Sequence, residues 1–429
     1  MIPIVIANGT AEQEIIAAMR ARAAGANQEI IQAVSAIMEK VRREGFPAVA
    51  DYSERFDRSA PYEIPQNRLD EAYAACDPTL IAALEHAASN IRAYNEKLLT
   101  RSAEWASPDG GVVGRVVRGL TRVGIYVPGG TAAYPSSVLM NAVPAKVAGV
   151  EEIVMVTPPT EHLNNAVLAA AKIAGVDRVI AVGGAQAVAA LTYGAGFIPK
   201  VDKLVGPGNA YVAAAKRLAY GALDIDMVAG PSEVLVIADG SANPCYVAAD
   251  LLSQAEHDKL ASAILLTDSA SLAQAVDREL ARQTALLSRS EIMACSLRDF
   301  SCAIVCADLN QAVALANEIA PEHLELMTEQ PRALLPAVKN AGAVFLGAWS
   351  PEPLGDYLAG PDHVLPTSGT ARFFSPLSAD SFLKTMSIIE YSRETLEPIK
   401  DEIITLAQSE LLTAHANSIQ VRFAQSEQN

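Results

Sequence analysis

Several features are scarce in this chain of 429 residues. Its five cysteines form no C-x-x-C pair, so a cysteine-type metal site is disfavoured and free, reduced thiols are expected. Basic residues number 33 against 49 acidic ones, and the formal net charge of -16 disfavours binding to nucleic acids or to anionic membrane surfaces. No apolar run approaches the roughly 20 residues of a membrane span.

The N-terminal segment, MIPIVIANGT, has an apolar stretch too short for a secretory signal and no basic residue before it. We therefore expect a protein of the cytoplasm. Cys302 and Cys306 lie in an apolar, strand-like run, where core positions are commoner than ligands. Hydrophobic residues make up 51% of the chain and charged ones 19%, which excludes a mainly disordered chain. The length predicts two or three folded units.

Two series of apolar, strand-like runs alternate with helical patterns. Continuous apolar strands between helices are typical of parallel sheets buried on both faces, so the pattern predicts two α/β domains. The first hundred residues and residues 379–427 are expected to be mainly helical, with a long amphipathic run from about Leu396. The predicted strands are 125–127, 153–157, 178–182 and 203–205 in the first series, and 234–238, 263–267, 302–306, 324–327 and 343–347 in the second.

Glycine-rich segments adjoin four of these strands: PGGT (128–131), GGAQ (183–186), GPGN (206–209) and GPSE (230–233). Ligands of α/β sheets collect at the carboxyl ends of strands, where glycine lets the backbone approach a ligand closely. Ordinary turn chemistry explains any one segment, but the four together favour a nucleotide or another phosphate-bearing ligand. The usual G-x-G-x-x-G fingerprint of a dinucleotide site is absent from that context.

Nitrogen and oxygen side chains suited to zinc occur in the second half of the chain. Gln254 and His257 are three residues apart on the predicted helix 244–257, which places them on one helix face. Asp356 lies in an irregular segment, 355–376, of the kind that more often has a function than not. His415 lies on the predicted C-terminal helix. Spacing alone does not show that these side chains meet, and each has an ordinary structural explanation.

Glu322 and His323 adjoin each other just before a predicted strand. Two neighbouring titratable groups near one cleft suit successive proton transfers. The same adjacency also arises by chance, so the pair alone is weak evidence.

Seven longer motifs together make the chain recognisable. It resembles the histidinol dehydrogenase family over nearly its whole length. The resemblance implies an NAD-dependent, zinc-dependent enzyme that oxidises L-histidinol to L-histidine through L-histidinaldehyde, with two NAD⁺ and water. The motifs are YVPGGTAAYPSSVLMNAVPAKVAGV, GGAQAVAAL, KLVGPGNAYVAAAK, DMVAGPSEVLVIAD, ADLLSQAEH, PEHLEL and GDYLAGPDHVLPT.

The resemblance also implies roles for individual residues. His323 is the expected base for alcohol oxidation, and Glu322 is expected to activate water on the aldehyde. The expected metal ligands, for one zinc per subunit, are Gln254, His257, Asp356 and His415. The expected substrate contacts are Ser232, Gln254, His257, His323, Asp356, Glu410 and His415. The expected NAD contacts are Tyr126, Gln186 and Asn209.

The family further implies two Rossmann-like domains and an intertwined homodimer, in which Glu410 and His415 reach the partner's site. The expected divisions are an N-terminal arm (1–20), a larger α/β domain (21–125 and 233–378), a second, NAD-side domain (126–232) and a C-terminal helical dimerisation segment (379–429).

The sequence departs from the family pattern at one local site. The loop after His257 begins with Asp258 and Lys259, where the family usually has glycine.

Three other functions remain open. A dehydrogenase of another small alcohol or diol is disfavoured by Glu410 and His415, which suit a substrate with an amine and an imidazole. A metal-dependent hydrolase would not need the glycine-rich strand ends. A pure binding or scaffold protein is the third alternative.

Overall fold

The computed structural model describes residues 1–24, 28–129, 134–160, 163–228 and 230–424, without the side chains of 18–24. Gly130 and Thr131 of the PGGT segment therefore lie outside the described residues. The chain divides into a larger unit, residues 1–98 and 120–382, and a smaller unit, residues 99–119 and 383–429. Among the described residues, no helix combines the length and the apolar character that crossing a membrane requires.

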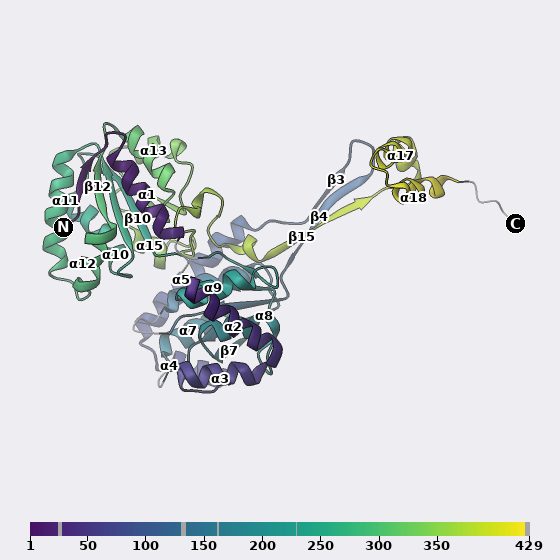
Figure 1. Ribbon diagram of the computed structural model, residues 1–429, viewed down its shortest axis with the longest axis horizontal. Coiled ribbons are helices and arrows are strands. Elements are labelled where there is room, and N and C mark those ends of the chain that lie inside the picture. The colour runs from purple at the N-terminus through teal and green to yellow at the C-terminus, as the bar shows by residue number, and fades with distance from the viewer. Residues whose placement is uncertain (25–27, 130–133, 161–162, 229, 425–429) are drawn as a thin grey trace. The chain divides into compact units, whose positions relative to one another are not determined.

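The first sheet of the larger unit is parallel throughout and buried on both faces (Figure 1). On its central strand, Val234 and Val236 pack against α10, α11 and α12, whereas Leu235 and Ile237 pack against α1 and α13. Because helices cover both faces of the sheet, the side chains on both faces of this strand are buried from solvent. In spatial order the strands are β1 (Ile4–Ile6), β12 (Cys302–Val305), β11 (Ser262–Thr267), β10 (Glu233–Ala238), β13 (His323–Met327) and β14 (Ala343–Leu346). The helices are α1 (Ala11–Ala24), α10 (Pro244–Ala255), α11 (Ala270–Thr284), α12 (Ser290–Phe300) and α13 (Leu309–Ile319).

The second sheet is parallel except for its edge strand β2, which runs antiparallel to β7. One face packs against α2, α3, α8 and α9, and α4 to α7 pack with one another. In spatial order the strands are β2 (Tyr62–Ile64), β7 (Arg178–Ala181), β6 (Glu152–Thr157), β5 (Arg122–Tyr126), β8 (Lys203–Val205) and β9 (Asp224–Ile225). The helices are α2 (Gln28–Glu44), α3 (Phe46–Asp57), α4 (Gln66–Ala75), α5 (Pro78–Leu98), α6 (Pro135–Val147), α7 (Asn165–Ala174), α8 (Gly184–Tyr193) and α9 (Ala210–Ala219).

The prediction of an α/β fold with two parallel sheets is confirmed. In each sheet the first strand of the chain, β1 or β2, is an edge strand. The later strands start near the centre, build outward to that side and then continue on the other side. This reversal lies between β5 and β8 in the second sheet and between β10 and β13 in the first. Such a topological switch point leaves a crevice at the carboxyl ends of the two strands, where dinucleotides bind in open α/β sheets.

The expected grouping of the N-terminal segments is wrong. Residues 1–20 do not form a separate arm, because β1 pairs with β12 and Ile16 belongs to the core of the first sheet. Residues 21–125 were expected to belong with 233–378, but α2 and α3 pack on the second sheet and β5 is its central strand. These associations are made by long-range packing, which local patterns do not encode.

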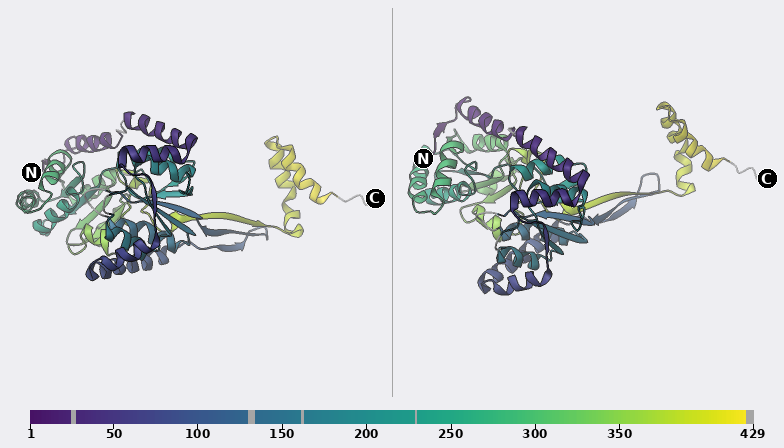
Figure 2. Two further views of the ribbon diagram at one scale, coloured as in Figure 1. Left: turned by 90° about the horizontal axis from the view of Figure 1, so that it is seen from below. Right: turned by 60° about the horizontal axis from the view of Figure 1, so that its bottom comes forward.

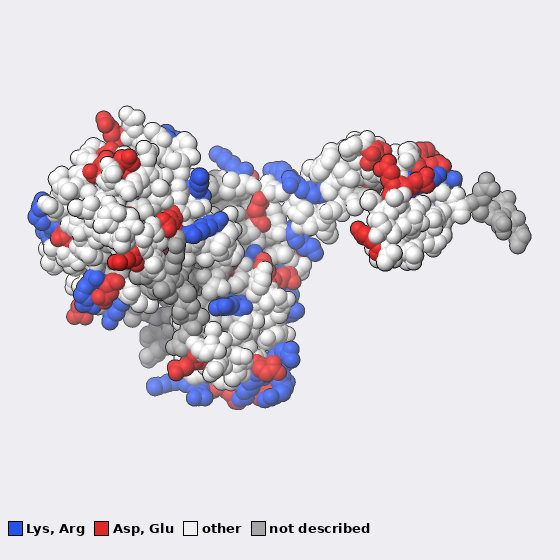
Figure 3. Space-filling model, turned by 45° about the horizontal axis from the view of Figure 1, so that its top comes forward, with Lys and Arg blue, Asp and Glu red and all other residues white. Residues whose placement is uncertain are grey.

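The smaller unit is an antiparallel ribbon, and its helices lie at the end where strand β15 finishes (Figure 2). The strands are β3 (Ala103–Ala106), β4 (Val112–Gly119) and β15 (Leu383–Glu390), and the helices are α17 (Lys400–Ser409) and α18 (Thr413–Phe423). The expected long helix from about Leu396 is therefore two helices, because Leu411 between them has a left-handed backbone with φ of 60°. The expectation of a mainly helical 379–427 missed β15. Acidic side chains gather on the helical part of this unit (Figure 3).

The remaining elements are short. They are α14 (Pro331–Leu334), α15 (Glu352–Tyr357), α16 (Arg393–Leu396) and four 3₁₀ turns, η1 (Leu335–Ala337), η2 (Thr370–Arg372), η3 (Ala379–Phe382) and η4 (Glu397–Ile399).

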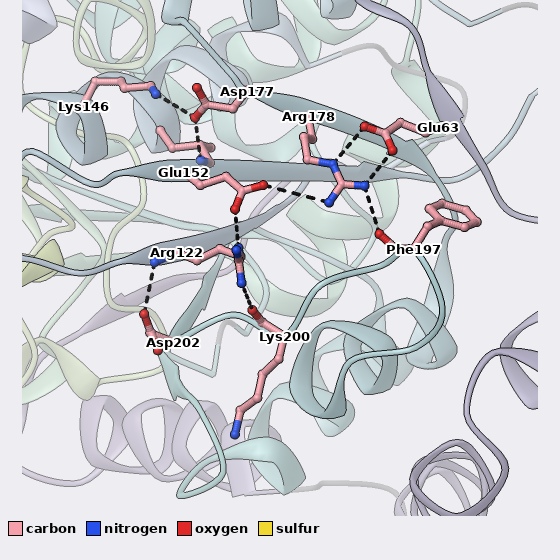
Figure 4. A network of polar contacts seen from close by, with 10 residues as sticks. Glu63, Arg122, Lys146, Glu152, Asp177, Arg178, Phe197, Lys200 and Asp202 are labelled. Carbon is pink, nitrogen blue, oxygen red and sulfur yellow. Dashed lines mark hydrogen bonds and ion pairs between the residues drawn. The ribbon is translucent and has the colours of Figure 1, made fainter.

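The amino ends of the second sheet are held by a network of charged side chains (Figure 4). Arg178, at the start of β7, donates to both carboxylate oxygens of Glu63 at 2.8 and 2.6 Å. Arg122, at the start of β5, pairs with Glu152. Because these charges are satisfied by one another, the amino edge of this sheet is structural, and its carboxyl edge is the one left for a ligand.

Candidate functional site

The predicted catalytic pair lies at the amino end of strand β13 in the first sheet. Glu322 immediately precedes the strand and His323 is its first residue. The neighbouring strand β10 begins at Glu233, and the backbone N–H of Glu233 donates to the Glu322 carboxylate at 2.8 Å. The expectation that all glycine-rich segments mark carboxyl strand ends is therefore wrong for GPSE. This segment and Glu322-His323 lie together at the amino edge.

His323 has one ring nitrogen bound and the other bare. Its Nδ1 lies 3.0 Å from the backbone oxygen of Glu233, and a carbonyl oxygen only accepts, so Nδ1 carries the proton. Nε2 is then an acceptor, and it is buried without a hydrogen-bond partner. Burial lowers the pKa of His323, which keeps the ring neutral. A neutral imidazole with an unoccupied lone pair is the form that a general base requires.

Glu322 is a buried carboxyl group beside this imidazole. Its Oε2 lies 3.7 Å from Nδ1 of His323. Burial raises the pKa of Glu322 well above its usual value, against the lowering effect of the hydrogen bond from the Glu233 backbone. A carboxylate with a raised pKa is a stronger base than a solvated one, which suits it to accept a proton from water.

Gln254 is the link between helix α10 and this pair. Its side-chain nitrogen lies 3.4 Å from Glu322 and 3.5 Å from Nδ1 of His323. Its side-chain oxygen is buried and has no partner. The helix ends at Ala255, so His257 lies beyond it rather than on the same helix face as predicted. In the loop after His257, which departs from the family pattern, the Asp258 carboxylate accepts from the backbone N–H of Leu260 at 2.8 Å and stabilises a turn.

Three side chains bring ligand atoms close enough to hold one cation. These atoms, from His257, Glu352 and Asp356, all lie within 4.8 Å of one another. Asp356 also lies 3.9 Å from Nε2 of His323. The irregular segment expected from residue 355 begins instead on helix α15, which carries Glu352 and Asp356 one turn apart. Our sequence reasoning missed Glu352, although its spacing of four residues from Asp356 was a signal for a shared helix face.

Within the part of the chain that the structure describes, no lysine or arginine forms an ion pair with Glu352 or Asp356. Burial raises the pKa of Glu352 to about 7, with a further increase from Asp356. Burial also raises the pKa of Asp356 to about 6. One oxygen of Glu352 accepts from the Ser253 hydroxyl at 2.8 Å, and the other is buried without a partner. A bound cation would satisfy these orphaned oxygens, and a donor set of imidazole, amide and carboxylate without sulfur fits zinc.

A cavity of about 610 Å³ opens beside the cluster within the larger unit. His323 and Asp356 contribute to its wall, together with His363, Phe345 and Leu365. Burial lowers the pKa of His363 to about 4, so this imidazole is neutral as well. The space is large enough for a small polar metabolite beside the bare Nε2 of His323.

The three predicted NAD contacts lie at the carboxyl edge of the second sheet. The Tyr126 hydroxyl, at the end of β5, accepts from the backbone of Gly184 at 3.0 Å. Burial raises the pKa of Tyr126 to about 12. Gln186 is buried on α8 and donates to Asp57 at 3.3 Å. Asn209 caps α9 by accepting from two backbone N–H groups.

The turns at this edge carry no side chain at two positions, Gly183 and Gly208. Gly183, the N-cap residue of helix α8, has no side chain to cap the helix, and the first N–H group, that of Gly184, is bound by the Tyr126 hydroxyl. The N–H groups that follow in the first turn of α8 are of the kind that bind anions at helix N-termini. A Cβ on Gly183 would lie 2.7 Å from Pro158, and one on Gly208 would lie 2.4 Å from Val212. Side chains are thus excluded from both turns. Two bare turns and a helix N-terminus beside a switch point fit the pyrophosphate of a dinucleotide.

The other predicted residues divide between the two units. Ser232 directly precedes β10, and its backbone oxygen accepts from Ser262 at 3.0 Å. Glu410 follows α17 and His415 lies on α18, so both belong to the smaller unit, where both are exposed. The cluster described above is formed by residues of the larger unit alone.

Comparison with known proteins agrees with this geometry. Residues 20–423 match the family model described as histidinol dehydrogenase. The chain is 54% identical over 397 residues to a histidinol dehydrogenase of Heliobacterium mobile, covering 91% of this chain and 92% of that protein. It is 50% identical over 416 residues to one of Syntrophotalea carbinolica, covering 96% of each.

The same likeness appears in three dimensions. A crystal structure of histidinol dehydrogenase from Elizabethkingia anophelis superposes with a TM-score of 0.93 and 36% identity, covering 98% of each chain. The chain therefore belongs to the histidinol dehydrogenase family, NAD-dependent oxidoreductases of histidine biosynthesis.

Proposed function

We propose that this chain oxidises L-histidinol to L-histidine through L-histidinaldehyde, with two NAD⁺ as hydride acceptors and water as the source of the second carboxylate oxygen. The observation that carries the proposal is the buried, unpartnered Nε2 of His323, a residue that lines a cavity beside a cation cluster and beside a second buried base, Glu322. Two bases of different chemistry suit two oxidations of one substrate in one place.

Zinc would be held by Gln254, His257 and Asp356, with His415 of a second copy as the fourth ligand. Glu352 is close enough to contribute charge or an oxygen. When bound, the metal supplies positive charge that holds and polarises the amine and imidazole of the substrate. The support is the set of orphaned polar atoms, among them Oε1 of Gln254, that converge on this place.

His323 would act in the first oxidation. Its Nε2 takes the hydroxyl proton of the alcohol as the carbon loses a hydride to NAD⁺, and the aldehyde is formed. The bond from Nδ1 to the Glu233 backbone fixes the ring and its tautomer throughout. The substrate contacts would be Ser232, Gln254, His257, His323 and Asp356 of one chain with Glu410 and His415 of the other.

Glu322 would act in the second oxidation. Its carboxylate takes a proton from water, and the resulting hydroxide adds to the aldehyde carbon. The hydrated aldehyde then loses a second hydride to a second NAD⁺, which leaves the carboxylate of histidine. The hydrogen bond from the Glu233 backbone orients one carboxylate oxygen and leaves the group free to receive the proton on the other.

NAD⁺ would bind at the carboxyl edge of the second sheet, with contacts from Tyr126, Gln186 and Asn209. Its diphosphate would occupy the bare turns after β7 and β8. We expect the enzyme to work in the cytoplasm, where biosynthetic substrates and NAD⁺ are found.

The active form would be a homodimer. Among the described residues of the smaller unit, the buried apolar side chains are Ala407 and Ala416, whereas Leu406, Ile389 and Trp105 are 66%, 76% and 55% exposed. A ribbon and two helices with so small a core do not bury enough surface to be stable alone. A second copy of the chain would cover these side chains.

The first test is NADH formation by the purified, zinc-loaded protein with L-histidinol and NAD⁺. We expect two NADH per histidinol, loss of activity with a chelator and recovery with zinc. Absence of NADH despite bound zinc and NAD⁺ would refute the substrate assignment and favour another small alcohol.

Two variants separate the proposed roles. Glu322→Gln should still oxidise histidinol to the aldehyde but lose oxidation of added histidinaldehyde by about 100-fold or more. His323→Asn should lose the alcohol step by a similar factor. Equal losses of both steps in both variants would contradict separate roles.

A further inference from the structure

A buried ion pair holds one turn of the second sheet, and the proposed function leaves it unused. Lys216, in the last turn of α9, pairs with Asp226, just after β9. Their side chains are 3% and 2% exposed. Burying two opposite charges costs desolvation energy that their attraction only partly returns, and apolar replacements are often as stable. Such a pair is therefore expected to fix a particular geometry.

Both charges also bind the backbone of one residue, Gly206. The Lys216 ammonium donates to the backbone oxygen of Gly206 at 2.8 Å, and the Asp226 carboxylate accepts from the Gly206 backbone N–H at 2.9 Å. The second oxygen of Asp226 accepts from the Met227 backbone at 2.6 Å. The ion pair thus holds Gly206 from both sides and ties it to the segment after β9.

Gly206 needs this support because of its own conformation. Its φ is 105°, and a Cβ at this position would lie 2.2 Å from the backbone oxygen of Tyr126. Gly206 therefore follows β8 in direct contact with the end of β5, at the switch point of the sheet. The turn continues through Gly208 to Asn209, the N-cap residue of helix α9.

We propose that Lys216 and Asp226 are positioning residues for NAD⁺: they hold the turn Gly206–Asn209 in the conformation that accepts the dinucleotide, without touching it. This inference rests on the proposed function, since it assumes that NAD⁺ binds at this edge. Loss of the pair relaxes the turn, so the affinity for NAD⁺ falls while the metal cluster in the first sheet is unaffected.

The chain offers a matched control two residues away. Asp224 also pairs with a lysine, Lys203, at 2.8 Å, but its side chain is 53% exposed and does not bind the turn. Asp226→Asn and Asp224→Asn make the same chemical change at the two ends of β9. Asp226→Glu keeps the charge, and the double variant Lys216→Met with Asp226→Asn leaves no buried unpaired charge.

The experiment measures the Kd of NAD⁺ by calorimetry, and then the KM for NAD⁺, the KM for histidinol and kcat, on zinc-loaded full-length protein. We expect Asp226→Asn and the double variant to raise the Kd and KM for NAD⁺ by about tenfold, which corresponds to about 1.4 kcal/mol. The KM for histidinol, the zinc content and all constants of Asp224→Asn should stay within about twofold, and Asp226→Glu should recover part of the affinity.

The contrary outcomes are distinct. NAD⁺ binding within about twofold of wild type in a folded Asp226→Asn or double variant overturns the inference, as does an equal rise in both KM values. If circular dichroism shows that neither variant folds, the pair supports the whole domain and the inference is also overturned. If the wild-type protein itself does not bind NAD⁺, the proposed function fails instead.

Discussion

Glu352 is a buried residue of the cation cluster that also contacts two elements of the first sheet's layer, helix α10 and strand β13. It contacts Ser253 on α10, and its backbone N–H donates to Glu325 on β13 at 2.9 Å. Replacing Glu352 with Gln removes one negative charge beside His257 and Asp356 and keeps the shape. We expect zinc affinity to fall by about tenfold to 100-fold, measured by competition with a coloured chelator.

Glu329→Gln is the matched control for this prediction. Glu329 is exposed beyond the carboxyl end of β13, at the opposite edge of the same sheet. It should leave the zinc affinity unchanged. Equal zinc affinities in Glu352→Gln and wild type would show that Glu352 only packs.

The cysteines differ in reactivity because they differ in burial. Burial raises the pKa of Cys302 to about 12 and that of Cys306 to about 11, so both thiols stay protonated and shielded. Cys76, Cys245 and Cys295 are partly exposed. At about pH 8, iodoacetamide should label these three in the native protein and all five after denaturation, as counted by mass spectrometry. Labelling of Cys302 in the native protein would contradict its burial.

At the scale of elements, helix α10 contacts the middle of strand β13 through two acids. Asp250 and Glu325 share a hydrogen bond, and burial raises the pKa of Asp250 to about 6 and that of Glu325 well above its usual value. The folded state therefore holds protons that the unfolded chain releases above about pH 4. Through Asp250 the stability falls as the pH rises from about 4 to about 6, and Glu325 adds a further loss in the same direction as it ionises.

Asp250→Asn tests this contact between the two elements. An amide does not ionise, and its oxygen can still accept from the protonated Glu325, so the variant should be more stable than wild type at about pH 8, by on the order of 2 kcal/mol. The difference should vanish near pH 4. Thermal unfolding at the two pH values measures it, and a difference in Tm that does not change with pH would contradict the assignment.

Among the secondary-structure elements, some strands could be predicted from the local sequence and others could not. The predicted strands 153–157, 234–238 and 263–267 each fall one residue short of β6, β10 and β11, because strands buried on both faces are continuous apolar runs. Strands β1 and β2 have three residues each and are defined by partners far along the chain, so no local pattern marks them. Strand β15 is mostly exposed and has no buried face to impose an alternation.

The sequence indicated the chemistry of the site but not where in the fold its residues come together. The pairs Gln254/His257 and Glu322-His323 carried recognisable chemistry, yet periodicity does not say which end of a strand faces a given helix end. The structure brings α10, β13 and α15 together at the amino edge, and this packing places Glu352 and Asp356 beside His257. The individual roles came from the family resemblance and stay predictions.

At the scale of the whole molecule, the smaller unit raises the question of what covers its exposed side chains. Leu406, Leu411 and Ile389 are 66%, 85% and 76% exposed, and the described part of the unit buries little apolar surface of its own. Patches of this kind usually mark an interface. In the proposed homodimer, His415 and Glu410 of this unit would complete the partner's site, so neither chain alone would be active.

Mixing two inactive variants decides whether the sites are shared. His323→Ala removes the base and His415→Ala removes the ligand that we assign to the other chain, so each homodimer should be dead. In a mixed dimer, one site combines both defects and the other combines two intact halves. After dissociation and reassociation of equal amounts, about a quarter of wild-type activity should return if mixing is random. If each site used its own His415, both sites of a mixed dimer would stay defective. No recovery, with mixed dimers verified by mass spectrometry, would therefore exclude the shared site, even if NADH formation by the wild-type protein confirms the reaction.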